Sequence, residues 1–200
     1  MKKFITISAL FLGASIPAMA IVFCPNAPQT EIVSLSQKGG AASAEKIMQI
    51  QAKEGLDVAR DSFLIYQLAS CEGAIDTLLA AAKKDNAYAI KALKMMKLAD
   101  AEDTLLGLVK AKAKSAKDAL DALSACGSEK TLNFLLDGMA KAGSLIGDYV
   151  KTATELYRAL PADKQAECKK QIDAQASSAD AKVKSALERV TAAPVAKAKK

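Results

Sequence analysis

A helical repeat of small and apolar residues runs through most of the chain, beginning near Ser43. Its first stretch places such residues in steps of three and four, at Met48, Ala52, Gly55, Ala59, Phe63 and Tyr66. This spacing puts them on one face of an α-helix, which is then buried against a partner helix. No stretch shows the alternation of every second residue, rich in β-branched side chains, that marks a strand. The chain is therefore predicted to be all-α.

Boundary signals divide this pattern into five helical stretches. Glu72-Gly73 interrupts the first, Asp100 and Ser128 are predicted to cap the third and fourth, and Pro161 precedes the fifth. Asp85-Asn86, within the second stretch, is interpreted as a kink. Each stretch has about 26 to 32 residues, or roughly 40–48 Å of helix. Because short connections favour antiparallel neighbours, we predict an up-and-down bundle of about five long helices.

The first twenty residues have the pattern of an export signal. Lys2 and Lys3 precede an apolar run over 4–16, and the small residues Ala18 and Ala20 form a cleavage site. The predicted organisation is a signal peptide at 1–20, a lead-in segment at 21–43 with a short helix around 31–37, a helical bundle domain at 44–191 and a basic tail at 192–200. The mature protein is predicted to be periplasmic or secreted, with no transmembrane span.

Cysteines are the next constraint, because an even number in an exported protein predicts disulfides. The chain has four, and it has no CxxC pair and no histidine, which removes the signatures of zinc fingers, c-type haem attachment and thioredoxin chemistry. In a five-helix bundle, Cys71 and Cys126 both end ascending helices at one pole. Since bonded cysteines need Cα atoms within about 7 Å, we predict a bundle stapled by two disulfides, Cys71–Cys126 and Cys24–Cys168. This pairing requires that Asp85-Asn86 is a kink and not a reversal.

The charge pattern contains one basic window. The net charge of the chain is +6, but the leader and the last four residues contribute most of it, which is poor evidence for nucleic acid binding. Residues 83–117 hold nine lysines against four acids and no arginine. Six of these lysines are candidates for a face that binds an anionic partner: Lys91, Lys94, Lys97, Lys110, Lys114 and Lys117. The favoured interpretation is a solvated face that neighbouring acids of 45–76 neutralise.

Three short motifs have both a chemical and a structural interpretation. The SxxK match at 43–46 occurs in serine enzymes that use a lysine base, but their other motifs are missing, so Ser43 is expected to cap a helix. Asp100, Glu102 and Asp103 form an acidic cluster for which capping and dipole stabilisation are the expected role. The GxxxG at 143–147 is expected to allow close approach of a neighbouring helix.

These features favour a non-catalytic protein with a binding or structural role in the bacterial envelope or secreted space. No catalytic, cofactor or metal residues are predicted. The expected partner is another envelope or secreted protein, or an anionic envelope polymer or lipid, and not a nucleic acid. Two alternatives are a membrane-active or secreted effector that uses the Lys-rich face, and an enzyme that uses carboxylates alone.

Overall fold

The structure, a computed structural model, describes residues 27–54 and 58–192. The predicted leader, Cys24 and the basic tail after residue 192 lie outside these residues. Within them the chain is all-α, as predicted, and contains no strand. The helices are α1 (Ala27–Lys38), α2 (Ala41–Glu54), α3 (Val58–Ala69), α4 (Ile75–Lys83), α5 (Ala87–Met96), η1 (Ala99–Ala101), α6 (Glu102–Lys110), α7 (Ala116–Cys126), α8 (Glu129–Gly138), η2 (Met139–Lys141), η3 (Gly143–Leu145), α9 (Ile146–Ala159), α10 (Ala162–Ser178) and α11 (Ala181–Thr191).

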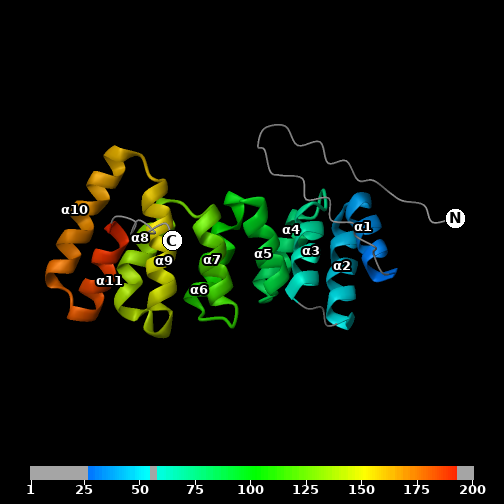
Figure 1. The fold of residues 1–200 in the computed structure, drawn as a ribbon, viewed down its shortest axis with the longest axis horizontal. Coiled ribbons are helices and arrows are strands. Elements are labelled where there is room, and N and C mark those ends of the chain that lie inside the picture. Colours follow the sequence, from blue (N-terminus) through cyan, green and yellow to red (C-terminus); the bar gives the residue numbers. More distant parts are fainter. Residues whose placement is uncertain (1–26, 55–57, 193–200) are drawn as a thin grey trace, which may run out of the picture.

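The prediction of about five long helices is wrong, because each predicted helix is a hairpin of two short ones. Three of the reversals contain a residue in the left-handed region of backbone space: Asp85 (φ 68°), Lys112 (φ 51°) and Gly143 (φ 58°). One such residue ends an α-helix and turns the chain back. The hairpins are α2–α3, α4–α5, α6–α7, α8–α9 and α10–α11 (Figure 1).

The GxxxG at 143–147 belongs to one of these reversals and not to a helix contact. A Cβ atom built on Gly143 or Gly147 would meet nothing within 4 Å. The expected close approach of a neighbouring helix at these glycines is therefore wrong. Gly143 serves the positive φ of the turn, which glycine adopts without steric cost.

The hairpins stand side by side in a row with two layers (Figure 1). The second helices of the hairpins form one layer, in which α3 packs on α5, α5 on α7, α7 on α9 and α9 on α11. We call these the A helices. The first helices form the other layer, where α2 contacts α4 and α4 contacts α6. We call α2, α4, α6, α8 and α10 the B helices. Such a row of stacked helix pairs is the architecture of an α-solenoid.

The core of the row repeats every thirty residues. Three A helices bury the same positions, which are Ala89, Ala119 and Tyr149; Ile90, Leu120 and Val150; and Leu93, Leu123 and Ala153. Two B helices do likewise, with Leu105 and Leu135, and Leu106 and Leu136. Val109 of α6 matches Met139, the residue directly after α8. Each hairpin thus covers the apolar face of the next, because a single hairpin cannot bury its own.

The row has two edges, which Figure 1 shows as lower and upper. The lower one, the turn edge, contains the reversals within hairpins, at 84–86, 111–115 and 139–145. The upper one, the connection edge, contains the links between hairpins, at 70–74, 97–101, 127–128 and 160–161.

The edges explain why the predicted Cys71–Cys126 disulfide is not formed. Both residues lie on the connection edge, as the pole argument required, but α5 packs between α3 and α7 and separates them. Asp85-Asn86 is a reversal and not a kink, so the condition on which the predicted pairing depended is not met. Cys71, Cys126 and Cys168 are buried free thiols. The predicted Cys24–Cys168 bond involves Cys24, which lies outside the described residues.

None of the described helices combines the length and the apolar character that crossing a bilayer would require.

Candidate functional site

The exposed surface of the A helices carries a row of side chains at equivalent positions. Tyr66, Lys91, Asp121 and Lys151 each follow, by two residues, a buried residue of α3, α5, α7 or α9: Leu64, Ala89, Ala119 and Tyr149. Because consecutive A helices pack on one another, these positions line up across the layer. We call this surface the A face.

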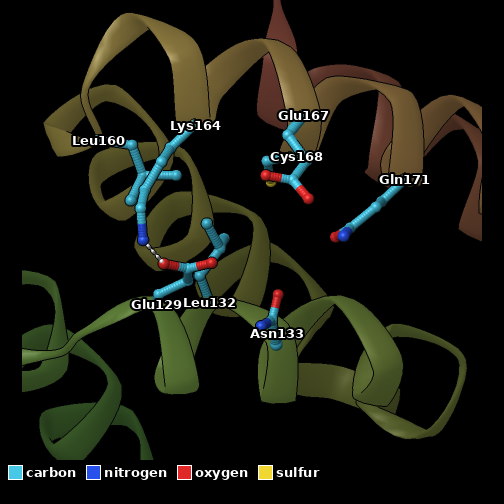
Figure 2. A pocket seen from close by; sticks show the side chains of 8 residues that line it. All are labelled: Glu129, Leu132, Asn133, Leu160, Lys164, Glu167, Cys168 and Gln171. Carbon is cyan, nitrogen blue, oxygen red and sulfur yellow. Dashed lines mark hydrogen bonds and ion pairs between the residues drawn. The ribbon is translucent and has the colours of Figure 1, made fainter.

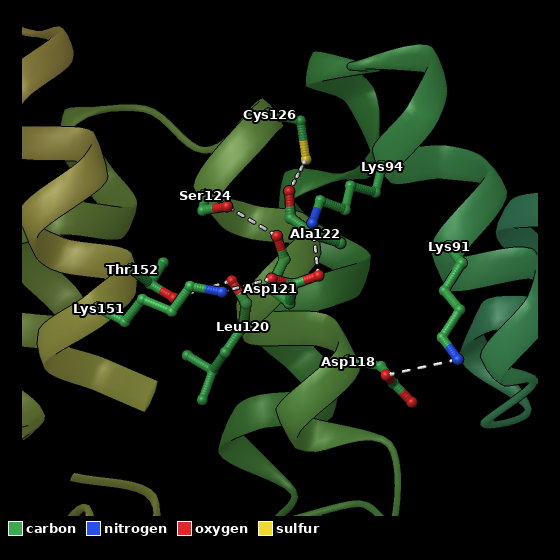
Figure 3. A network of polar contacts seen from close by, with 10 residues as sticks. All are labelled: Lys91, Lys94, Asp118, Leu120, Asp121, Ala122, Ser124, Cys126, Lys151 and Thr152. Atoms are coloured by element: carbon green, nitrogen blue, oxygen red, sulfur yellow. Dashed lines mark hydrogen bonds and ion pairs between the residues drawn. The ribbon is translucent and has the colours of Figure 1, made fainter. Parts of the chain in front are cut away.

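Ion pairs connect three helices of the A face (Figure 3). The Lys94 ammonium of α5 lies 2.5 Å from Asp121 of α7, and the Lys151 ammonium of α9 lies 2.9 Å from the other oxygen of the same carboxylate. Lys91 of α5 lies 3.9 Å from Asp118 of α7. The charges therefore alternate along the row, from α5 (positive) to α7 (negative) to Lys151 of α9 (positive).

We call the ion pairs of Lys91, Lys94, Asp118, Asp121 and Lys151 the ion-pair ladder. Its central carboxylate, Asp121, is held in its charged form near neutral pH. Partial burial acts to raise the pKa of Asp121, but the hydrogen bonds and charges of Lys94 and Lys151 outweigh it and lower the pKa. The hydrogen bond and charge of Asp121 in turn raise the pKa of Lys151. A carboxylate fixed between two ammonium groups is a poor proton donor or acceptor at this pH, so the arrangement suits binding and stabilisation better than acid–base chemistry.

The six lysines of the candidate anionic-partner face do not share one surface. Lys91 and Lys94 belong to the A face and neutralise Asp118 and Asp121. Lys97, in the left-handed conformation, ends α5 on the connection edge. The remaining three lie at or next to the turn edge, at Lys110, Lys114 and Lys117.

The acidic cluster of 100–103 links neighbouring hairpins. Glu102 accepts hydrogen bonds from the Ser128 N–H at 2.8 Å, the Ser128 hydroxyl at 2.7 Å and the Thr131 hydroxyl at 2.5 Å. Asp103 pairs with Lys130 at 2.5 Å. Asp100 lies in η1, and the residue before α6 is Ala101, so its predicted capping role is wrong. No group of three or more His, Cys, Asp or Glu side chains suited to a metal occurs among the described residues.

Two predicted helix caps have different outcomes. Ser128 caps α8, since its side chain accepts the Lys130 N–H. Ser43 is instead the third residue of α2 and is buried, so its predicted capping role is wrong. The lysine of the same SxxK motif, Lys46, pairs with Glu31 at 2.7 Å.

Two adjoining hollows lie near the connection edge of the α8–α9 hairpin. One, between α8 and α10, has a volume of about 10 Å³, room for one water molecule, and the Glu129–Lys164 ion pair (2.5 Å) closes one side of it (Figure 2). The other has about 140 Å³ and is lined mainly by α8, α9 and the link at 127–128. Both are smaller than the 300–1,000 Å³ typical of small-molecule sites.

Cys168 borders the smaller hollow but lacks the features of a nucleophile. Burial, together with the charges of Glu129 and Glu167, raises the pKa of its thiol. Since the thiolate is the reactive form, these surroundings make Cys168 inert. Its role is packing.

Sequence reasoning missed the A face because it treated each hairpin as one helix. A signal was present: the segments 89–93 (AIKAL) and 119–123 (ALDAL) are nearly the same and lie thirty residues apart, and 149–153 (YVKTA) continues the series. The middle residues of the three segments are Lys91, Asp121 and Lys151, the alternating row of charges. Two large apolar side chains, Tyr66 and Met95, are exposed on this layer. The helical spacing predicted that Tyr66 is buried against a partner helix, and this prediction is wrong.

Comparison with known proteins found no matching family model, no matching curated protein and no matching solved structure.

Proposed function

We propose that this protein is an exported, non-catalytic binding scaffold that holds another envelope or secreted protein on its A face. The observation that carries the proposal is the continuous layer of α3, α5, α7, α9 and α11. A row of stacked hairpins presents a long surface whose neighbouring positions come from successive helices, and solenoid proteins bind their partners on such surfaces.

The composition of the A face supports a protein partner. Tyr66 and Met95 are 46% and 49% exposed, and they are two of the three large hydrophobic residues exposed in the described part of the chain. Because α3 packs on α5, Tyr66 and Met95 lie on neighbouring helices. Tyrosine and methionine are enriched in protein interfaces, where each buries a large area at moderate entropic cost.

The ion-pair ladder supports the same proposal through preorganisation. Asp121 ties α7 to both neighbours, and the Thr152 hydroxyl of α9 donates to the Leu120 carbonyl of α7 at 2.9 Å. A surface held in its binding shape loses less entropy on association. The carboxylates of Asp121 and Glu102 are engaged in such contacts, which favours a binding role over a carboxylate-only enzyme.

Photo-crosslinking in the producing cell tests this proposal. A photoreactive amino acid is placed at Tyr66 or Met95 on the A face, and at Ala80, an exposed residue of the B helix α4, as the control. We expect a discrete protein adduct from the first two positions and none from the third. Equal adducts from all three, or none from Tyr66 and Met95, would reject the A face as the binding surface.

A second measurement separates binding from folding. The Tyr66→Ala, Met95→Ala double variant removes exposed side chains, so its urea denaturation midpoint is expected to stay near that of the wild type. Recovery of the crosslinked partner by the purified variant should nevertheless fall at least tenfold. Undiminished recovery would contradict the proposal.

A further inference from the structure

The turn edge gathers exposed lysines from two successive hairpins. They are Lys83 at the end of α4 and Lys84 after it, Lys110 at the end of α6, Lys112 and Lys114 in the next turn, and Lys117 in the first turn of α7. The two turns touch, because the Asp85 carboxylate accepts the backbone N–H groups of Ser115 (3.0 Å) and Lys114 (3.2 Å). We call these six residues the lysine edge.

The lysine edge keeps most of its positive charge. Among the described residues, none of the six forms an ion pair within 4 Å. Asp118 pairs with Lys91 and so does not neutralise this edge. Asp85, which accepts the N–H groups of the next turn, lies within the edge and its charge attracts Lys114, so one negative charge stands against six positive ones. Lys110 lies over the Phe134 ring at 5.2 Å, a contact that leaves its charge in place.

Helix stabilisation accounts for only part of this cluster. Lys83 and Lys110 lie in the last turns of α4 and α6, where a cation complements the helix dipole. Lys117 lies in the first turn of α7, where the dipole disfavours a cation. Lys112 occupies a left-handed position that glycine or asparagine would adopt at lower cost. Folding alone does not call for lysine at these two positions.

We infer that the lysine edge docks the protein on the surface of an anionic lipid bilayer, an inference that goes beyond the proposed protein-binding role of the A face. The six residues lie along one border of the row and are exposed, which is the placement that contact with one flat surface requires. Clusters of four to eight basic residues are typical of proteins that bind anionic lipid electrostatically. Docking by this edge leaves the A face, on the side of the row, free for a partner.

Two features favour lipid over nucleic acid. The lysine edge contains no arginine, whose planar group makes the paired hydrogen bonds that recognise a single phosphate. The aromatic residue beside it, Phe134, is partly buried and covered by Lys110. It offers no stacking platform for bases, which single-stranded nucleic acid requires.

Vesicle sedimentation of the full mature chain tests the inference. The vesicles contain 40% phosphatidylglycerol in phosphatidylcholine, with pure phosphatidylcholine vesicles as the neutral comparison. The test variant replaces Lys110, Lys112 and Lys114 by Gln. Two controls lose the same charge elsewhere: one replaces Lys170, Lys182 and Lys184, exposed on α10 and α11, and the other replaces Lys197, Lys199 and Lys200.

We expect binding to the anionic vesicles only, and a loss of about a hundredfold in the partition coefficient of the test variant. Each control should lose less than about tenfold. Binding of the wild type should also weaken as salt rises from 50 to 500 mM, because the attraction is electrostatic. A second variant of the same edge replaces Lys83, Lys84 and Lys117 by Gln. It tests the edge independently in case the first variant misfolds.

Three results would overturn the inference. The first is no binding of the wild type to anionic vesicles. The second is an equal loss in the test variants and in either control, which would indicate attraction by net charge or by the tail. The third is tighter retention of the wild type by duplex DNA than by the vesicles, with the same dependence on the lysine edge, which would assign this surface to a nucleic acid instead.

Discussion

The carboxylate of Glu102 accepts the hydroxyl of Thr131 at 2.5 Å and so joins the first turns of two successive B helices. Thr131 is fully buried, and the same carboxylate accepts the N–H of Ser128 just before α8. On the opposite edge, the Asp85 carboxylate accepts the backbone N–H of Ser115 in the turn of the next hairpin. An acid from one hairpin thus satisfies polar groups of the following hairpin on both edges of the row.

Removal of the Glu102 carboxylate is expected to destabilise the fold. Glu102→Ala leaves the Thr131 hydroxyl buried without a partner and the start of α8 without one of its acceptors, which costs about 1–3 kcal/mol. Urea denaturation followed by circular dichroism measures the loss. Asp103→Ala is the control, since Asp103 is exposed and pairs only with Lys130, and it should change the midpoint little. Equal effects of the two substitutions would contradict the linking role of Glu102.

The contribution of Glu102 should depend on pH. Partial burial acts to raise the pKa of Glu102, but hydrogen bonds from Thr131 and Ser128 outweigh it and lower the pKa below its usual value. A lowered pKa means that the stabilisation is fully present above the unfolded-state pKa of about 4.3 and is lost as pH falls through the lower folded-state value. The difference in midpoint between the wild type and Glu102→Gln should therefore be constant from pH 7 to 5 and shrink below pH 4. A constant difference down to pH 3 would show that ionisation of Glu102 is not involved.

The sequence revealed the helical class and the links between hairpins, because their signals are local. Ser128 caps α8, and Pro161 directly precedes α10. The reversals inside hairpins were missed for different reasons. Asp85-Asn86 and Gly143 are residues typical of turns, but the first was interpreted as a kink and the second as part of a helix contact. Lys112 takes a left-handed conformation that few side chains favour, while Leu108, Lys112 and Ala116 keep a spacing of four across the turn and imitate a continuous helix face.

The candidate site was harder to predict, because its contacts join residues about thirty positions apart. The pairs Lys94–Asp121 and Asp121–Lys151 form only when hairpins stack. A bundle of long helices does not predict contacts of Lys91 and Lys94 with these acids, so the two lysines were placed on a solvated face that was also a candidate for binding anions. Recognition of the repeated segments at 89–93 and 119–123 is what would have placed them correctly.

The three described cysteines are expected to be free and slow to react. Burial raises the pKa of Cys126 to about 11, with a smaller contribution from Glu102, and burial also raises the pKa of Cys71 and Cys168. At pH 8 their thiolate population is therefore small, and access is limited. Dithionitrobenzoate should label them at least a hundredfold faster in 8 M urea than in the native protein. A Cys71–Cys126 linked peptide in a non-reducing digest would contradict the structure.

The A-face ladder should stabilise the fold modestly and in a salt-dependent way. Asp121→Asn removes the partner of both Lys94 and Lys151, and because these groups are partly exposed the expected loss is about 0.5–1 kcal/mol at low salt. Screening by 1 M NaCl should abolish most of the difference from the wild type. Asp173→Asn, which breaks a pair with Lys169 within α10, should cost less. A loss that does not respond to salt would indicate packing rather than charge.

The reversal at Asp85 is the feature that most sharply separates a row of hairpins from a bundle of long helices, and a distance measurement decides between them. Asp76 lies in the first turn of α4 and Met95 in the last turn of α5, and both are exposed. In one continuous helix their Cα atoms would lie about 28 Å apart, at 1.5 Å per residue. In the hairpin both lie near the connection edge, on helices that pack on each other, and packed helix axes are about 8–10 Å apart. Spin labels on Asp76→Cys and Met95→Cys, in a chain with its native cysteines replaced by alanine, should therefore give a distance below about 20 Å by electron paramagnetic resonance. The pair Asp76→Cys and Lys84→Cys spans α4 alone and should give about 12 Å in either arrangement, which calibrates the reach of the labels. A distance near 30 Å for the first pair would restore the long helix and remove the alignment on which the A face and the lysine edge both depend.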